Sequence, residues 1–126
     1  MSYNSFSKNE KLCSKDKIDF VFASGQKISD HPIKLKWVEV PCQDNNLQTL
    51  ISVPKRKIPN ASDRNKIKRL MRESFRINKH KLIDQLVKNN ISVNLAIIYS
   101  HNKVISYKNI HDKICLTLHR LSQKYD

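Results

Sequence analysis

The most regular pattern in the chain is an alternation of apolar and polar residues. Residues 33–40, IKLKWVEV, begin as a strict alternation, which predicts a half-buried β-strand. Trp37 falls on the apolar side of this strand, so we expect it in the core. Lys34 and Lys36 fall on the other side and would place two cations on a sheet surface that faces away from the core.

Two further strands complete the predicted sheet, with room for one more. Residues 50–53 form a short apolar run that ends at Pro54, and residues 93–99, VNLAIIY, form a longer one. Such a run is typical of a strand covered on both faces, so we expect residues 93–99 to be the most buried strand. Residues 41–48 are polar and turn-like. The region near Lys27 leaves room for an additional short strand.

Helical spacing of apolar residues marks both ends of the chain. Residues 12–25 predict a short amphipathic helix that Ser14 can cap and Gly25 can end. A final helix opens at Ser106 or Asn109. Together with the strands and a long central helix, these segments give the order α-β-β-α-β-α, to which the optional strand can be added.

The longest helical pattern runs from residue 60 to residue 90, and nothing within it breaks a helix. Ser62 or Asp63 can cap this helix. At about 100° per residue, one of its sides is apolar and continues into Leu82 and Leu86. The members of this side are Ile67, Leu70, Met71, Ser74 and Phe75.

The chain shows no internal repeat and no linker. Its 126 residues are enough for one hydrophobic core without stabilising cross-links. We therefore expect a single domain at residues 11–126, preceded by a flexible polar arm at residues 1–10.

Positive charge is concentrated in residues 55–81. They hold eleven Lys or Arg and two acids, a net +9 of the +13 carried by the whole chain. Arg64, Lys68 and Arg72 recur every four residues, on an arc facing away from the apolar side of the helix. A solvated helix face normally mixes signs so that ion pairs form between turns, and this stretch has few acids to do so. The stretch therefore predicts a surface for an anionic ligand such as a nucleic acid.

Composition argues against several other classes of protein. One glycine is too few for a glycine-rich phosphate loop, and no apolar run approaches the roughly 20 residues of a membrane span. No secretory signal is visible, so we expect a cytoplasmic location and no membrane partner. The eleven acids are scattered and offer no pair that would gather divalent ions. We therefore expect the chain to contain no catalytic residues.

The cysteines Cys13, Cys42 and Cys115 lie far apart and show no paired spacing. In a reducing compartment such residues are small buried apolar groups or free thiols. His111, Cys115 and His119 recur at four-residue intervals in the last helix, a spacing that metal ligands can have. No fourth ligand can be named for them, so we expect no metal and no cofactor bound to the protein itself.

Residues 64–76, RNKIKRLMRESFR, resemble the protein subunit of bacterial ribonuclease P. That family carries a helix with the pattern Arg-Asn-x-x-Lys-Arg-x-x-Arg-Glu, and this chain fills every position. The preceding residues 52–65, SVPKRKIPNASDRN, are similar to the family's strand end and basic pair, and residues 12–25 are similar to its first helix. The resemblance extends from Leu12 to the last helix.

The resemblance implies a fold and a function. The fold is α+β with the order α-β-β-β-α-β-α and a small mixed sheet, whose basic helix lies in a left-handed βαβ crossover where the general rule predicts a right-handed one. The function is that of the protein component of ribonuclease P, the endoribonuclease that matures the 5′ end of tRNA. The catalyst is the RNA subunit, which would also hold most of the Mg²⁺. The protein would bind this RNA and precursor tRNA, as a monomer within the ribonucleoprotein.

The resemblance also assigns two groups of site residues by position. The group for binding the RNA subunit consists of Lys55, Arg56, Arg64, Asn65, Lys68, Arg69 and Arg72. The group lining a cleft for the single-stranded 5′ leader, between the first helix and the sheet, consists of Ile18, Phe22, Lys34 and Lys36. The family often has an aromatic residue at Ile18 and a Tyr at Lys36, and neither residue of this chain can stack equally on a base. A register shift of one residue would put Trp37 in the cleft in place of Lys36.

Other nucleic-acid-binding proteins share part of this pattern. A general structured-RNA-binding protein of the ribosomal type, without a nuclease partner, fits the charge distribution as well. A DNA-binding repressor usually pairs its basic helix with a second helix across a short turn, whereas strands flank this one. For an RNA-binding mechanism, each neutralised phosphate should add about −0.9 to the log–log salt slope of binding for duplex and about −0.7 for single strands.

Overall fold

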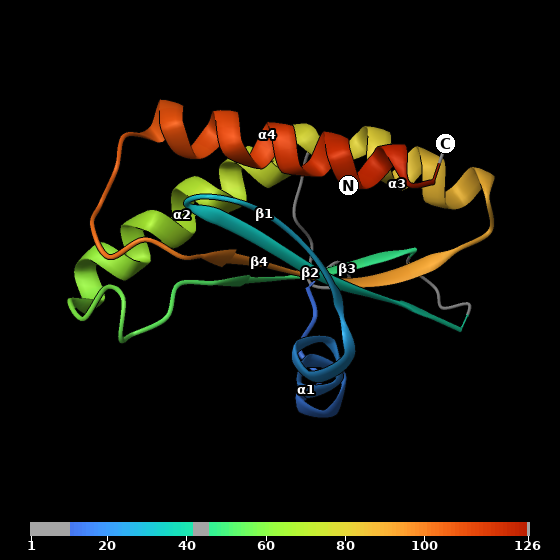
Figure 1. The fold of residues 1–126 in the computed structure, drawn as a ribbon, viewed down its shortest axis with the longest axis horizontal. Coiled ribbons are helices and arrows are strands. Elements are labelled where there is room, and N and C mark those ends of the chain that lie inside the picture. Colours follow the sequence, from blue (N-terminus) through green and yellow to red (C-terminus); the bar gives the residue numbers. More distant parts are fainter. Residues whose placement is uncertain (1–10, 42–45, 126) are drawn as a thin grey trace.

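The computed structural model describes residues 11–41 and 46–125, which form one four-stranded sheet with helices on both of its faces (Figure 1). The arm predicted at residues 1–10, and Cys42, lie outside the described residues. The strands are β1 (Gln26–Asp30), β2 (Ile33–Val40), β3 (Leu47–Ser52) and β4 (Ser92–Tyr99). Their spatial order is β1-β2-β4-β3.

The sheet is mixed, as predicted. β2 pairs antiparallel with both β1 and β4, whereas β3 pairs parallel with β4. The predicted bounds of β2 are confirmed, and the optional strand near Lys27 is β1. β3 begins at Leu47, inside a segment predicted to be a turn, because the parallel ladder with β4 already includes the pair Leu47–Val93.

Three helices cover one face of the sheet: α2 (Ala61–Asn78), α3 (His80–Lys88) and α4 (Tyr107–Gln123). The main hydrophobic core lies between these helices and the alternate residues of β2 and β4, and it includes Trp37, Leu95 and Phe75. Every residue of β4 is buried, which confirms that it is the most buried strand. Ser106 caps α4 by accepting a hydrogen bond from the Asn109 backbone N–H.

A single helix, α1 (Lys15–Ser24), covers part of the opposite face (Figure 1). Ser14 is its N-cap, as predicted, and accepts from the Lys17 backbone N–H. Val21 is the one buried residue of α1, and it packs with Val38, Ala96 and neighbouring residues in a second, smaller hydrophobic cluster. The sheet is therefore thickly covered on one face and thinly on the other.

The central helical segment differs from its prediction in two details. One continuous helix was expected over residues 60–90, but the structure interrupts it at Lys79, between α2 and α3. A straight helix of this length would extend about 1.5 Å per residue, far beyond the end of the strands beneath it. The interruption keeps the apolar side of α3, with Leu82 and Leu86, on the core. The N-cap is Asn60, not Ser62 or Asp63, since its Oδ1 accepts from both of those backbone N–H groups at 2.9 and 3.2 Å.

The element order of the predicted fold is confirmed, with α2 and α3 together occupying the place of the central helix. These two helices connect β3 to the adjacent parallel strand β4, and the left hand of this crossover stays a prediction. On its outer side β3 is joined by the segment leading into α1, through a parallel bridge between Lys11 and Thr49. In the described part of the chain, no helix is long and apolar enough to cross a membrane.

Candidate nucleic-acid interface

Helix α2 separates an apolar side from a basic one. Ile67, Met71 and Phe75 are at most 1% exposed and anchor the helix in the main core. The opposite side, which we call the basic face, consists of Arg64, Asn65, Lys68, Arg69 and Arg72. Asn65, Arg69 and Arg72 are exposed, whereas Arg64 and Lys68 are partly buried. The structure therefore brings these five predicted residues to one solvent-facing side of a rigid helix.

Arg64 also has a structural role. Its Nη1 donates to the carbonyl oxygens of Ile58 and Pro59, at 3.1 and 2.7 Å. These contacts fasten the first turn of α2 to the segment that precedes it. One edge of the guanidinium is thus used within the protein, which fixes the direction of the rest.

The two other predicted cations lie in a tight turn between β3 and α2, which we call the basic turn. The backbone N–H groups of Lys57 and Ile58 donate to the Pro54 carbonyl, at 3.0 and 3.1 Å, and so close the turn. The side chains of Lys55 and Arg56 are exposed at its tip. Because the basic turn leads directly into α2, its charges continue those of the basic face.

One acid of α2 is engaged by a neighbouring cation. Glu73 forms an ion pair with Arg76, one turn away, and accepts from both Nε and Nη2 of that guanidinium. The hydrogen bond from Arg76 lowers the pKa of Glu73 below its ordinary value, and Glu73 in turn raises the pKa of Arg76. Glu73 is thus neutralised by Arg76, which is not part of the basic face, so the basic face keeps its positive charge.

The predicted leader cleft gathers around α1 and β2. Lys36 Nζ donates to the backbone carbonyl of Phe22 at 3.1 Å and lies 5.8 Å from the centre of the Phe22 ring. Phe22 is 37% exposed, and Ile18 is half-buried against the smaller cluster. Trp37 is on the other face of the sheet, 1% exposed, with its Nε1 donating to the Tyr125 hydroxyl at 3.2 Å. Of the two residues considered, Lys36 and not Trp37 lies beside Phe22.

The structure adds a cation that the sequence did not identify. Lys27 in β1 is the direct partner of Lys36 in β2, and Ser29 is the partner of Lys34. Lys27, Lys34 and Lys36 therefore project from the same face of the sheet, the one that carries α1. Like charges directly opposite each other destabilise a strand pair, so this arrangement favours an anion above it. The place of Lys27 beside Lys36 follows from the register of the β1–β2 hairpin. The sequence could not predict this register, because β1 has too few apolar residues to fix its pairing with β2.

A groove links the basic face to the side of the sheet that carries α1. Its volume is about 290 Å³, and its walls come from the segment before α1, from β3 and from α2. Arg72 of the basic face is one of the lining residues, together with Lys11 and Thr49. Thr49 is 2% exposed, and its hydroxyl has no hydrogen-bond partner in the structure. The groove thus lies between Arg72 of the basic face and the segment that leads into α1.

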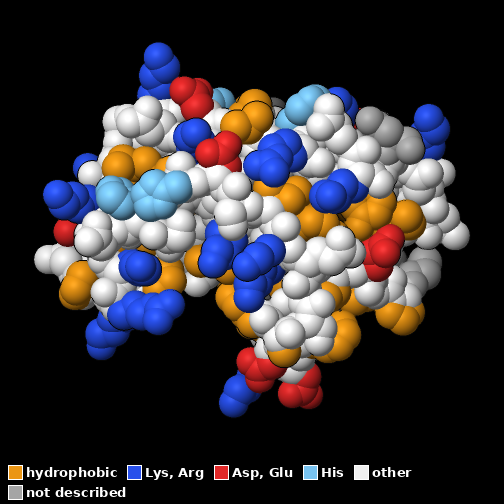
Figure 2. Space-filling model, viewed as in Figure 1, with side chains coloured by type: hydrophobic (Ala, Val, Ile, Leu, Met, Phe, Trp, Pro, Cys, Tyr) orange, Lys and Arg blue, Asp and Glu red, His pale blue; other side chains and the backbone are white. Residues whose placement is uncertain are grey.

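Figure 2 shows Lys and Arg side chains spread over the view, with groups over the sheet next to α1 and at the end where the basic turn lies.

The cysteine and metal predictions have separate outcomes. Cys13 and Cys115 are free and exposed, so of the two alternatives the free thiol applies to both. His111, Cys115 and His119 do not form a metal site. Across residues 11–41 and 46–125, no three or more His, Cys, Asp or Glu side chains are placed to hold a metal ion.

Sequence comparisons identify related proteins along nearly the whole chain. A family model described as Ribonuclease P matches residues 6–122. The ribonuclease P protein component of Porphyromonas gingivalis is 28% identical over 117 residues, which are 92% of this chain and 85% of that protein. The corresponding protein of Legionella pneumophila is 32% identical over 109 residues, which are 80% of this chain and 94% of that protein.

Solved structures with the same fold are also similar along most of the chain. The RNase P protein of Staphylococcus aureus, solved at 2.0 Å, has a TM-score of 0.73 at 19% identity, covering 93% of this chain and 98% of its own. The RNase P protein of Thermotoga maritima has a TM-score of 0.67 at 19% identity, covering 88% of this chain and 96% of its own. At such low identity these likenesses support the fold.

Proposed function

The chain belongs to the ribonuclease P protein family, and we propose that two separate groups of its basic residues bind two different RNAs of that enzyme. As a member, it is the non-catalytic protein subunit of a ribonuclease that processes tRNA, and its partners are ribonuclease P RNA and precursor tRNA. In the proposal, the basic face and the basic turn bind the catalytic RNA. The cleft beside α1 binds the single-stranded 5′ leader.

The basic face and the basic turn suit a folded RNA because they are rigid and continuous. Exposed Arg69 and Arg72 can each present a guanidinium fork to a phosphate, and Asn65 can donate to sugar or phosphate oxygens. Arg64 is already oriented by its contacts with the preceding segment. Releasing counterions from the bound phosphates would supply most of the affinity and make it sensitive to salt.

The cleft beside α1 suits a single strand because it combines cations with one exposed ring. Phe22 can stack on a base, whereas Ile18 can only offer apolar contact. Lys34 and Lys36, with Lys27 beside them, can neutralise leader phosphates. Leader binding by this chain therefore depends more on electrostatic contacts, and less on base stacking, than it would in a cleft with several aromatic residues.

The protein contributes position and charge to the reaction. Ribonuclease P works with metal ions, and we propose that Mg²⁺ is held mainly by the RNA partner, with no cofactor on the protein. By neutralising both the catalytic RNA and the leader, the protein would reduce repulsion between them and favour Mg²⁺ at the cleavage site. We also propose that the protein acts as a monomer within the ribonucleoprotein, in the cytoplasm.

The observation that carries the proposal is the exposed basic face on a helix whose other side is locked in the core. The test mixes the purified protein with a bacterial ribonuclease P RNA and 5′-labelled precursor tRNA at low Mg²⁺. We expect cleavage only when both protein and RNA are present. Salt-sensitive RNA binding without any stimulation of cleavage would instead favour the general RNA-binding protein of the ribosomal type. Cleavage by the protein alone would contradict its non-catalytic role.

A charge-matched pair of variants sharpens the test. Replacing Arg64, Lys68 and Arg72 by Ala should abolish activation at low Mg²⁺. Because Arg64 also holds the start of α2, the double variant Lys68→Ala/Arg72→Ala separates RNA binding from that structural contact. The control Lys88→Ala/Lys124→Ala removes two exposed cations from elsewhere and should leave activation nearly unchanged. Equal losses in both double variants would show that total charge matters, and not the basic face.

A further inference from the structure

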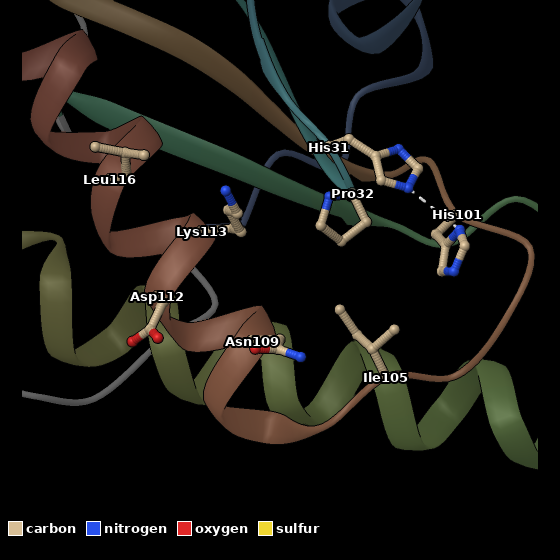
Figure 3. Close-up of a pocket in the computed structure, with 8 residues that line it drawn as sticks. All are labelled: His31, Pro32, His101, Ile105, Asn109, Asp112, Lys113 and Leu116. Atoms are coloured by element: carbon tan, nitrogen blue, oxygen red, sulfur yellow. Dashed lines mark hydrogen bonds between the residues drawn. The ribbon is translucent and has the colours of Figure 1, made fainter.

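A pocket far from the cleft beside α1 lies where the β1–β2 turn, the β4–α4 loop and α4 meet (Figure 3). Its volume is about 430 Å³, at the lower end of the range for ligand sites and so suited to a small ligand. We call it the His-pair pocket, because His31 Nε2 and His101 Nδ1 lie 3.2 Å apart at its rim. The two imidazole rings meet edge to face, with centroids 4.9 Å apart.

The walls of the His-pair pocket are held in place by contacts between the elements that form it. The Pro32 carbonyl accepts from both the backbone N–H and the hydroxyl of Ser100, at 2.7 and 3.0 Å, which joins the β1–β2 turn to the end of β4. Lys113 of α4 forms an ion pair with Asp30 of β1 at 3.0 Å. The Tyr99 hydroxyl donates to the Lys103 carbonyl and closes the loop that carries His101. The pocket is thus preorganised.

The lining combines apolar walls with a few polar groups. Pro32, Ile105 and Leu116 supply apolar surface, and Leu116 is 42% exposed although it lies on an otherwise well-packed helix. Figure 3 shows Asn109 directed toward the loop that carries His101, whereas Asp112 points away from the two imidazoles. An amide group that can both donate and accept therefore faces a space bounded by rings and apolar side chains.

The charges around the His-pair pocket argue against an anion as its ligand. The ammonium of Lys113 is already paired with Asp30, and the other charged lining residue is the acid Asp112. In the described residues, no third His, Cys, Asp or Glu joins the two histidines to complete a metal site. A neutral, flat, hydrogen-bonding group fits these surroundings better than a phosphate or a cation.

The His-pair pocket opens at the end of the sheet from which the basic turn emerges. β3 and β4 run parallel with Ser52 opposite Ile98, so the chain leaves β3 toward Lys55 at the same end where β4 leads to His101. Figure 2 shows His side chains above a group of Lys and Arg side chains at one end of the molecule. An RNA strand held by the basic turn would therefore pass close to the pocket.

We propose that the His-pair pocket binds one unpaired nucleobase of an RNA whose backbone is held by the basic turn. The base inserts between the apolar walls, stacks on the partly buried imidazole ring of His101, and pairs its polar edge with the Asn109 amide. Unpaired bases are commonly recognised by stacking and edge hydrogen bonds of this kind. This inference rests on the proposed function and adds a neutral, base-directed site to its charged surfaces.

The test compares the salt dependence of RNA binding between variants. Asn109→Ala should weaken binding several-fold at every salt concentration, with an unchanged log–log salt slope, because a base contact releases no counterions. His101→Ala should lose about five- to a hundredfold, and His101→Phe should recover most of this loss, because a phenyl ring can still stack. Asn102→Ala, an exposed residue of the same loop outside the lining, is the matched control and should behave as wild type.

Two arms of the experiment identify the source of the base. One measures affinity of the protein for ribonuclease P RNA, and the other measures affinity of the assembled holoenzyme for precursor tRNA. A loss in the first arm supports the proposal, because the basic turn is assigned to ribonuclease P RNA. A loss confined to the second arm would place the base in precursor tRNA and contradict it. Dimethyl sulfate probing should find one base of ribonuclease P RNA that wild-type protein protects and His101→Ala leaves reactive.

The outcomes that overturn the proposal are distinct from those that overturn the proposed function. Unchanged affinities in both arms, or failure of His101→Phe to rescue, would exclude base stacking in this pocket. A shallower salt slope in Asn109→Ala or His101→Ala would show that the pocket holds a phosphate. If the wild-type protein activates ribonuclease P RNA and the pocket variants bind RNA as tightly as the wild type, only the proposal for the pocket is contradicted. If the wild-type protein does not activate the RNA, both proposals fall.

Discussion

On one face of the sheet, three helices bury the side chains of β2 and β4, whereas on the other face one ten-residue helix covers part of the same strands. The first face carries Trp37, Leu95 and the apolar side of α2 in the main core. The second has a smaller apolar cluster and leaves Phe22 exposed, with Lys34 and Lys36 partly so. The same two strands thus supply both faces through alternate residues.

The difference between the faces separates stability from binding. Burial of apolar surface is the main source of stability, and most of it lies on the first face. The second face can therefore keep cations close together and a ring in solvent at little cost to the fold. Substitutions should act differently on the two faces, and the three predictions below test that separation.

The largest effect is expected in the main core. Phe75→Ala should lower the free energy of unfolding by about 3–5 kcal/mol, because it removes a ring that is 1% exposed and leaves a cavity. Ile18→Ala, on the thinly covered face, should cost only about 1 kcal/mol, since Ile18 is partly exposed. Denaturant titration measures both values.

Precursor binding should show the reverse order. At a temperature where both variants are folded, Ile18→Ala should weaken binding of the leader and Phe75→Ala should not. If the two substitutions cost the same stability, or if Phe75→Ala alone impairs leader binding, the division between the faces is wrong.

An intermediate effect is expected where α1 ends. A Cβ on Gly25 would lie 2.4 Å from the Val21 carbonyl oxygen and 3.2 Å from both the backbone N and O of Trp37. Gly25→Ala should therefore distort the end of α1, loosen its contact with β2 and cost about 1–3 kcal/mol. It should also separate Lys36 from Phe22 and weaken leader binding, while assembly with the catalytic RNA is retained.

Ser24→Ala provides the control for Gly25→Ala, because Ser24 is the exposed neighbour in the same helix. Denaturant unfolding and holoenzyme binding of precursor tRNA measure the two consequences separately. A Gly25→Ala variant with wild-type stability and leader affinity would show that α1 is not fixed against β2 at this point.

The smallest effect is expected from Lys27→Ala. The side chain is exposed, so the change in unfolding free energy should stay within about 0.5 kcal/mol. If Lys27 contacts a leader phosphate, the log–log salt slope for precursor binding should become shallower by about 0.7. Lys88→Ala serves as the comparison at an exposed site on α3. An unchanged slope for Lys27→Ala would remove Lys27 from the cleft.

Local pattern was enough to predict much of the fold. Strand β2 could be delimited because it begins with a strict alternation, and the amphipathic side of α2 followed from helical spacing. The interruption at Lys79 could not be predicted, since no proline or glycine marks it and its cause is the length of the sheet beneath the helix. The start of β3 was missed for a similar reason, because pairing with β4 extends it into a polar segment.

The candidate site divides in the same way. The basic face could be predicted because its residues are close in sequence, and family resemblance supplied the cleft. Lys27 and the His-pair pocket depend on tertiary contacts between segments that are far apart, such as His31 with His101. Neither Lys27 nor the two histidines stand in a local sequence pattern that distinguishes them from other surface residues.

The position of β4 in the sheet has a consequence for how the protein folds. β4 lies between β2 and β3 and is the strand partner of β3, yet the chain makes it after α2 and α3. During synthesis, β3 can therefore pair with β4 only after the whole of α2 and α3 has been made. Pairings between residues as distant as Ile33 and Tyr99 give the sheet a high contact order, which slows folding relative to a helical protein of similar size. The catalytic RNA can meet a correctly packed α2 only after α4, which packs against α2 and follows β4 in the chain, has also left the ribosome.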